Sequence, residues 1–167
     1  MTTNSVSPEI HDQSARTITG GLEAEYSVLR VWLRLLTCTT LIEHEVSGRL
    51  RNDFDTTLPR FDLMAQLARF PEGLGMGELS ERLMVSGGNI TGITDNLERD
   101  ELVERITPPE DRRAKKVRLT DKGRAAFGKM AADHKIWIED LLSSLSEQEQ
   151  LQLYALLGKL KHGILAS

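Results

Sequence analysis

Residues 86–100 read SGGNITGITDNLERD and place apolar side chains at Ile90, Ile93 and Leu97. The i, i+3, i+7 spacing predicts a helix with one buried face, and Ser86 is a favourable N-cap for it. The opposite face has short polar side chains and glycines, which would allow a close approach to base edges and phosphates. We therefore expect this helix to contact DNA through Ser86, Gly87, Asn89, Thr91 and Asn96.

The residues on either side extend this helix into a larger motif. Upstream, residues 78–85 predict a short helix with Leu79, Leu83 and Met84 facing inward, followed by a tight turn, so the two helices form a helix-turn-helix. Downstream, residues 102–106 and 115–120 both alternate apolar and polar side chains. This alternation predicts a two-stranded hairpin, with the charged residues 107–114 at its tip.

The run DRRAKKVRLTDKG at residues 111–123, after LERDELVER at residues 97–105, resembles the winged helix-turn-helix of the MarR family of bacterial transcription regulators. The most specific part is the wing signature, Asp-x-Arg followed by Val-x-Leu-Thr. The resemblance implies a mainly α-helical fold with a small β-hairpin wing. A winged helix-turn-helix lobe at residues 57–120 would combine with a helical dimerisation layer at residues 22–52 and 121–167. Residues 22–167 would form a single domain.

Charge is unevenly distributed along the chain. There are 21 basic and 25 acidic residues, a net charge of −4, yet residues 105–118 contain six basic and two acidic residues and sum to +4. A basic projection on an acidic body would hold the wing to a polyanion. The resemblance implies that Arg113 enters the minor groove, that Asp111 fixes its guanidinium by a charge-assisted bond, and that phosphates are held by Arg112, Lys115 and Lys116.

The helices outside this lobe predict a homodimer. Residues 22–51 form a helical pattern with two apolar stripes, which need two covering surfaces, and the second surface would be another copy of the chain. Thr120 would cap a long helix to about residue 145, and residues 146–149 form a capping box for a last helix with one apolar face. Such a dimer calls for a pseudo-palindromic double-stranded DNA operator with half-site centres about 10 base pairs apart.

The family also implies a cleft for a small-molecule effector, often an aromatic acid and in some members its CoA thioester. An arginine beside an aromatic wall could pair with a carboxylate or phosphate. The candidate lining is Trp32, Arg34, Cys38, His44, Arg60, Phe61 and Met64. In the alternative interpretation Trp32, Phe61 and Met64 belong to the core and Arg34 is solvated.

The composition of the chain indicates its cellular location and predicts the character of its N-terminal residues. Residues 1–21 are polar and end in two glycines, so we expect a flexible arm, or an arm that packs on a partner subunit. There is no apolar run long enough to span a membrane and no signal peptide. Cys38 is the only cysteine and forms no internal disulfide, which is consistent with the cytoplasm.

There are three alternatives to a ligand-responsive repressor. A thiol-based redox regulator would use Cys38, but its sequence neighbours Thr37 and Thr39 carry no positive charge to activate the thiol. An enzyme is not expected, because the four histidines lack metal-ligand spacing and no phosphate-binding glycine loop follows a strand; neither a metal nor a cofactor is expected. A winged-helix module that binds protein instead of DNA is the main rival.

Two positions depart from the family pattern. Met76 stands where a capping Thr or Ser is common, and a missing cap costs about 1 kcal/mol. Glu101 stands where the family often has Gly at the end of the second, recognition helix. We expect either a strained left-handed residue, costing about 1 kcal/mol, or a different helix exit.

Overall fold

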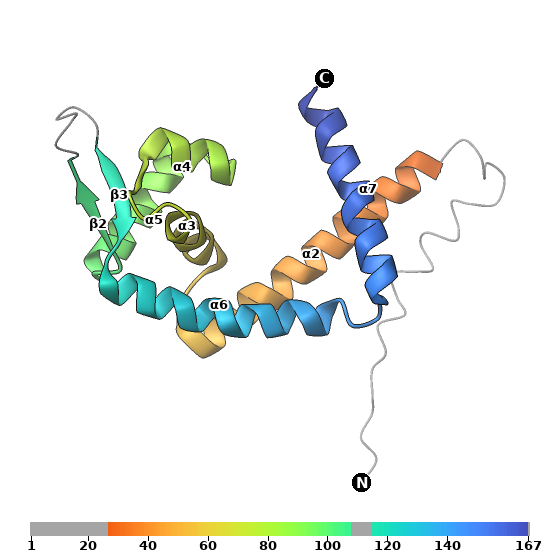
Figure 1. Ribbon diagram of the computed structural model, residues 1–167, viewed down its shortest axis with the longest axis horizontal. Helices are drawn as coiled ribbons and strands as arrows, with labels where there is room; N and C mark the ends of the chain where they lie inside the picture. The colour runs from red at the N-terminus through yellow and green to blue at the C-terminus, as the bar shows by residue number, and fades with distance from the viewer. Residues whose placement is uncertain (1–26, 108–114, 167) are drawn as a thin grey trace, which may run out of the picture. The chain divides into compact units, whose positions relative to one another are not determined.

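The computed structural model describes residues 27–107 and 115–166. The chain is mainly α-helical with a small antiparallel sheet, as predicted (Figure 1). Its elements are α2 (Ser27–Phe54), α3 (Leu58–Ala68), β1 (Leu74–Gly75), α4 (Met76–Leu83), α5 (Gly87–Arg99), β2 (Val103–Ile106), β3 (Lys116–Leu119), α6 (Asp121–Leu141) and α7 (Glu147–Leu165). The predicted N-terminal arm lies outside the described residues.

The sheet has three strands in the order β1-β3-β2, all antiparallel. The predicted hairpin is present as β2 and β3, which run side by side in Figure 1, with Val103 opposite Leu119. The two-strand prediction was incomplete, because β1 pairs with the other edge of β3 and sets Leu74 opposite Val117. A two-residue strand has no periodicity to detect, so only the pairing reveals it.

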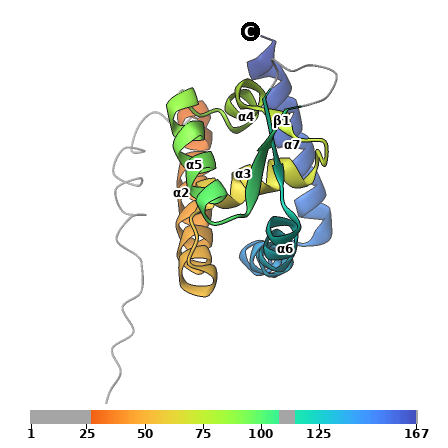
Figure 2. The same cartoon turned by 90° about the vertical axis from the view of Figure 1, so that its left-hand side faces the viewer.

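The core of the lobe is built around α3. Thr57 is the N-cap of α3 and Pro59 lies in its first turn, as predicted. The helix packs against α4, α5, α6 and β3, and Figure 2 shows α5, α3 and the sheet side by side. Its buried side chains meet those of the helix-turn-helix and the sheet. The buried apolar residues of these elements are Phe61, Leu63, Met64, Leu67, Leu74, Leu79, Ile90, Leu97, Val103, Val117 and Leu119.

The chain divides into two compact units, Met1–Ile42 and Glu43–Ser167, with the boundary inside α2. In the first unit, most apolar side chains of the described helix are exposed, Trp32 by 56%. In the second unit, the remaining part of α2 buries Val46 and Leu50. The predicted division into a winged lobe and dimerisation helices remains a prediction.

The last two helices begin as predicted. The Thr120 hydroxyl accepts a hydrogen bond from the Gly123 N–H at 2.9 Å. Ser146 and Glu149 form a capping box, in which the Ser146 N–H donates to the Glu149 carboxylate at 2.8 Å. Helix α6 ends at Leu141, earlier than predicted.

Candidate nucleic-acid interface

Helix α4 is the first member of the helix-turn-helix. Its N-cap is Gly75, whose N–H donates to the Glu78 carboxylate at 2.8 Å. Met76 is therefore the first helical residue and not the cap, which corrects the sequence interpretation. At its other end, Met84 adopts a left-handed conformation with φ +53°. This turn leaves Met84 91% exposed, so the prediction that it faces inward is wrong.

Helix α5 is the second member, and Ser86 caps it as predicted. The Ser86 hydroxyl accepts a weak hydrogen bond from the Asn89 N–H at 3.5 Å. The buried side chains are Ile90, Thr94 and Leu97, whereas Ile93 is only half-buried. With 3.6 residues per turn, position 94 lies in line with positions 90 and 97. The helix therefore buries a threonine at the centre of the face that packs on the core.

The opposite face of α5 is open to solvent. The five residues predicted to contact DNA from this helix are all exposed: Ser86, Gly87, Asn89, Thr91 and Asn96. A side chain added at Gly87 would meet no atom within 4 Å. The hydroxyl of Thr91 is engaged with the Gly87 carbonyl at 2.9 Å, and the Asn96 amide oxygen accepts from Arg99 at 2.8 Å. This face can meet a groove without moving backbone.

The end of α5 is a Schellman motif. The Leu102 N–H donates to the Leu97 carbonyl at 2.9 Å, and the Glu101 N–H donates to the Glu98 carbonyl at 2.9 Å. Glu101 adopts φ +60°, the first of the two predicted exits. Lys122 supports it, because its ammonium donates to the Asp100 carbonyl at 2.9 Å and to the Glu101 carboxylate at 3.0 Å.

The wing is less cationic than its sequence indicates. Of the six basic residues counted between positions 105 and 118, Arg112 and Arg113 lie outside the described residues, as does Asp111. Arg105 pairs with Asp95 and Glu98 on α5. Lys115 is exposed and Lys116 half-buried. Arg118 pairs with Glu104 at 2.7 Å. Two of the four described cations are therefore engaged within the protein.

A hollow of about 490 Å³ lies where the end of α2, the start of α3, the end of α5 and the start of α6 meet. Inside it Arg60 Nη2 is 2.5 Å from Asp100 Oδ2, whereas Arg60 Nε is buried and has no hydrogen-bond partner. The lining consists of Phe54, Asp55, Thr56, Arg60, Asp100, Leu102, Lys122, Ala126, Lys129 and Met130. A buried donor without a partner is uncommon, and an arginine in the lining of a hollow can pair with a carboxylate.

The other residues predicted to line a ligand cleft lie in different parts of the structure. Phe61 is in the core, with its ring centroid 5.5 Å from Phe127 and 4.8 Å from His134. Met64 is also buried. His44 is exposed on the second unit. Trp32, Arg34 and Cys38 belong to the first unit, where each is exposed.

Sequence reasoning missed two residues of this region. Asp100 pairs with Arg60, forty positions earlier. Lys129 lies in the lining of the same hollow. Neither has a local signal, because the α3, α5 and α6 residues meet only in three dimensions.

Within residues 27–107 and 115–166, no helix has the length and apolarity needed to cross a membrane. The same ranges contain no group of three or more His, Cys, Asp or Glu side chains arranged to hold a metal ion.

Comparison with known proteins places the chain among helix-turn-helix regulators. The family model described as MarR family matches residues 56–115. An uncharacterized HTH-type transcriptional regulator of Bacillus subtilis, YkoM, is 32% identical over 139 residues, covering 83% of this chain and 86% of YkoM. A MarR family transcriptional regulator from Silicibacter pomeroyi is 28% identical with a TM-score of 0.70, covering 92% of this chain and 98% of that one. A mutant MarR from E. coli, solved with operator DNA, shares the fold at 22% identity and a TM-score of 0.72, covering 81% of this chain and 96% of that one.

Proposed function

The chain belongs to the MarR family of HTH-type transcriptional regulators, and from this premise we propose that it represses transcription as a homodimer on a specific DNA operator until a small ligand releases it. The observation that carries the proposal is the exposed polar face of α5 beside a wing. A helix of this kind fits the major groove of B-DNA.

The α5 residues would divide between phosphates and bases. Ser86, Gly87 and Asn89 lie at the N-terminal end, where free N–H groups and the helix dipole favour a phosphate. Thr91 and Asn96 lie further along the exposed face, where they would reach base edges. An Asn side chain can bind adenine through two hydrogen bonds. We therefore expect an adenine opposite Asn96 in each half-site, once the Asn96 side chain is released from Arg99.

The wing would contribute most of the salt-dependent attraction. Among the described residues Lys115 and Lys116 have no charged partner, and they would hold phosphates. By resemblance, Arg113 would enter the minor groove with Asp111 beside it, and Arg112 would contact the backbone. The acidic remainder of the chain would weaken binding to any DNA that the wing and α5 do not fit.

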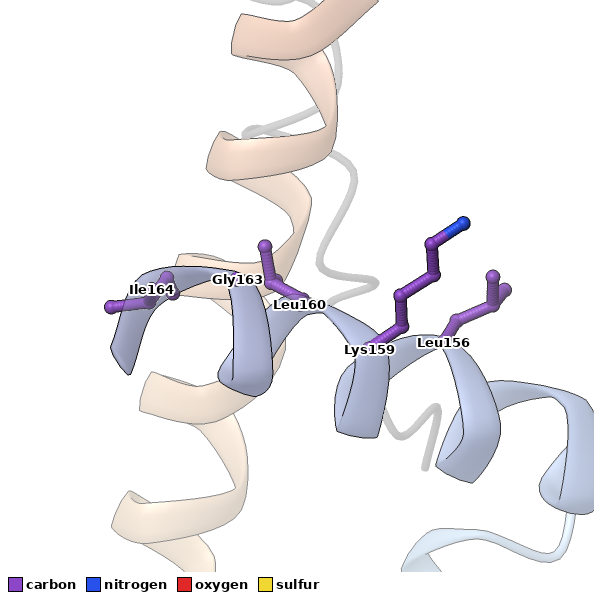
Figure 3. Close-up of a pocket in the computed structure, with 5 residues that line it drawn as sticks. All are labelled: Leu156, Lys159, Leu160, Gly163 and Ile164. Carbon is purple, nitrogen blue, oxygen red and sulfur yellow. The ribbon is translucent and has the colours of Figure 1, made fainter. Parts of the chain in front are cut away.

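Helix α7 supports the homodimer. None of its residues, all of which the structure describes, is buried. Leu151 is 70% exposed and Tyr154 80%. Figure 3 shows neighbouring side chains of this helix around a hollow lined by Leu156, Lys159, Leu160, Gly163 and Ile164. Soluble monomers rarely expose such a continuous apolar surface. A second copy would cover it, and the two-fold axis of the pair would require a pseudo-palindromic operator.

The hollow around Arg60 supports an anionic effector, such as an aromatic acid or its CoA thioester. A ligand carboxylate would receive the free Arg60 Nε–H and compete with Asp100 for the rest of the guanidinium. Lys129 lies in the same lining. Because Asp100 is the C-cap residue of α5, releasing it would favour a different placement of that helix and reduce its fit to DNA.

Titration of the purified chain against labelled genomic fragments tests the proposal. We expect a dimer by light scattering, and one fragment bound more tightly than scrambled DNA of the same length. Its affinity should fall steeply with salt. A monomer, or equal affinity for scrambled DNA at low salt, would contradict it; the rival protein-binding module predicts no salt-dependent DNA affinity.

A second experiment tests the effector site. A panel of aromatic acids is titrated into the protein–operator complex, and into the complex of the Arg60→Met variant. An acid that releases wild-type protein should lose this effect in the variant, whereas Arg30→Met, which removes an exposed arginine of the other unit, should leave release unchanged. An acid that acts equally on wild type and Arg60→Met would remove Arg60 from the site.

A further inference from the structure

Arg105 lies on β2 and reaches across to the recognition helix. Its Nη2 is 2.5 Å from Asp95 Oδ1, and its Nη1 contacts Glu98 Oε2. The neighbouring Glu104 points to the other side of the strand, where it pairs with Arg118. One guanidinium therefore holds two carboxylates that lie three residues apart on one helix.

The charges of α5 explain why this matters. Among its residues, Asp95 and Glu98 are negative and Arg99 is positive, a sum of −1. The two acidic side chains are 50% and 39% exposed, so their negative charges would act on a nearby DNA backbone. Phosphates repel such a helix. Adding Arg105 brings the sum to zero.

The Arg105 guanidinium is already hydrogen-bonded within the protein. Each of its terminal nitrogens donates one hydrogen bond to a carboxylate oxygen, so a phosphate could use only the remaining N–H groups, beside two negative charges. The hydrogen bond to Asp95, followed by the charges of Glu98 and Asp95, raises the pKa of Arg105. The simple charge count of the wing therefore overstates its phosphate-binding capacity.

We propose that Arg105 is a positioning residue for DNA binding, which cancels the carboxylates of Asp95 and Glu98 on the recognition helix and does not itself contact phosphate. The inference rests on the proposed function. It differs from a simple basic-patch interpretation, in which every wing cation binds the DNA backbone.

The test compares four proteins on the operator selected above. They are the wild type, Arg105→Gln, the double variant Asp95→Asn/Glu98→Gln, and the triple variant that combines all three changes. Dissociation constants are measured against salt concentration, and circular dichroism checks folding. Arg118→Gln is the matched control, because it removes the other paired arginine of the wing and frees a carboxylate away from α5.

We expect Arg105→Gln to weaken operator binding about tenfold or more, since two uncancelled carboxylates then face phosphates. The triple variant should return to wild-type affinity or tighter, with an unchanged salt slope. Arg118→Gln should have a smaller effect than Arg105→Gln.

The inference is overturned if the triple variant binds as weakly as Arg105→Gln. A salt slope smaller by about 0.9 would then identify a phosphate contact. An unchanged slope would show that Arg105 acts only by linking the wing to the recognition helix. If Arg105→Gln does not fold, the double variant decides. Tighter binding than wild type with an unchanged salt slope supports charge cancellation, whereas weaker binding, or tighter binding with a salt slope larger by about 0.9, refutes it. Absence of binding by the wild type would instead remove the proposed function.

Discussion

Replacing Gly123 by Ala should strongly destabilise the junction between the recognition helix and the wing. Gly123 is buried in the first turn of α6, and an added Cβ would lie 1.9 Å from the Leu102 carbonyl oxygen and 2.8 Å from its carbon. Ordinary contact needs about 3.4 Å, so the two segments must separate by roughly 1.5 Å. That movement would also break the hydrogen bond from the Thr120 N–H to the Leu102 carbonyl, now 3.1 Å long.

The expected cost combines opposing effects. Overpacking against rigid backbone costs about 1–3 kcal/mol, and sometimes more, and the lost hydrogen bond costs about 1 kcal/mol. The better helix propensity of Ala offsets this by at most about 1 kcal/mol. We therefore expect Gly123→Ala to lower the free energy of unfolding by at least about 1 and up to about 4 kcal/mol. Operator affinity should fall as well, because Leu102 closes the end of the recognition helix.

Gly128 provides the matched control on the same helix. An added Cβ there would meet nothing within 4 Å, so Gly128→Ala should stabilise by up to about 1 kcal/mol. Urea unfolding followed by circular dichroism, at one fixed protomer concentration, gives both values. A Gly123→Ala protein within about 1 kcal/mol of the wild type would refute the steric argument.

Three further outcomes are expected. Glu101→Gly should raise the free energy of unfolding by up to about 1 kcal/mol, because glycine accepts the left-handed conformation and the exposed Lys122 pair is weak; a loss of stability in urea would show that the pair dominates. Burial lowers the pKa of His134 below 6.5, so the stability it provides is complete above pH 6.5 and is lost as pH falls through the folded-state pKa. His134→Phe should flatten thermal stability across that window, and an unchanged pH profile would exclude the histidine. Arg113→Ala should weaken operator binding and reduce the salt slope by about 0.9 without altering dimer mass, whereas unchanged affinity would remove the wing tip from the mechanism.

Elements with local causes could be predicted from the order of residues along the chain. Ser86, Thr120 and Ser146 each start a helix because a side-chain oxygen and the N–H it accepts lie within three residues. The alternation of apolar and polar side chains predicted β2 and β3. The order of these elements along the chain resembled that of the family. These predictions succeeded because capping and periodicity depend on neighbours along the chain.

The charges that remain available and the polar groups that are buried became evident from the three-dimensional contacts. Arg105 and Arg60 are ordinary cations in the sequence, yet one is held by Asp95 and Glu98 and the other by Asp100. The strand β1 likewise exists only through its pairing with β3. The physical reason is that these ion pairs and strand pairings depend on distances between residues 7 to 43 positions apart, which neither composition nor periodicity specifies.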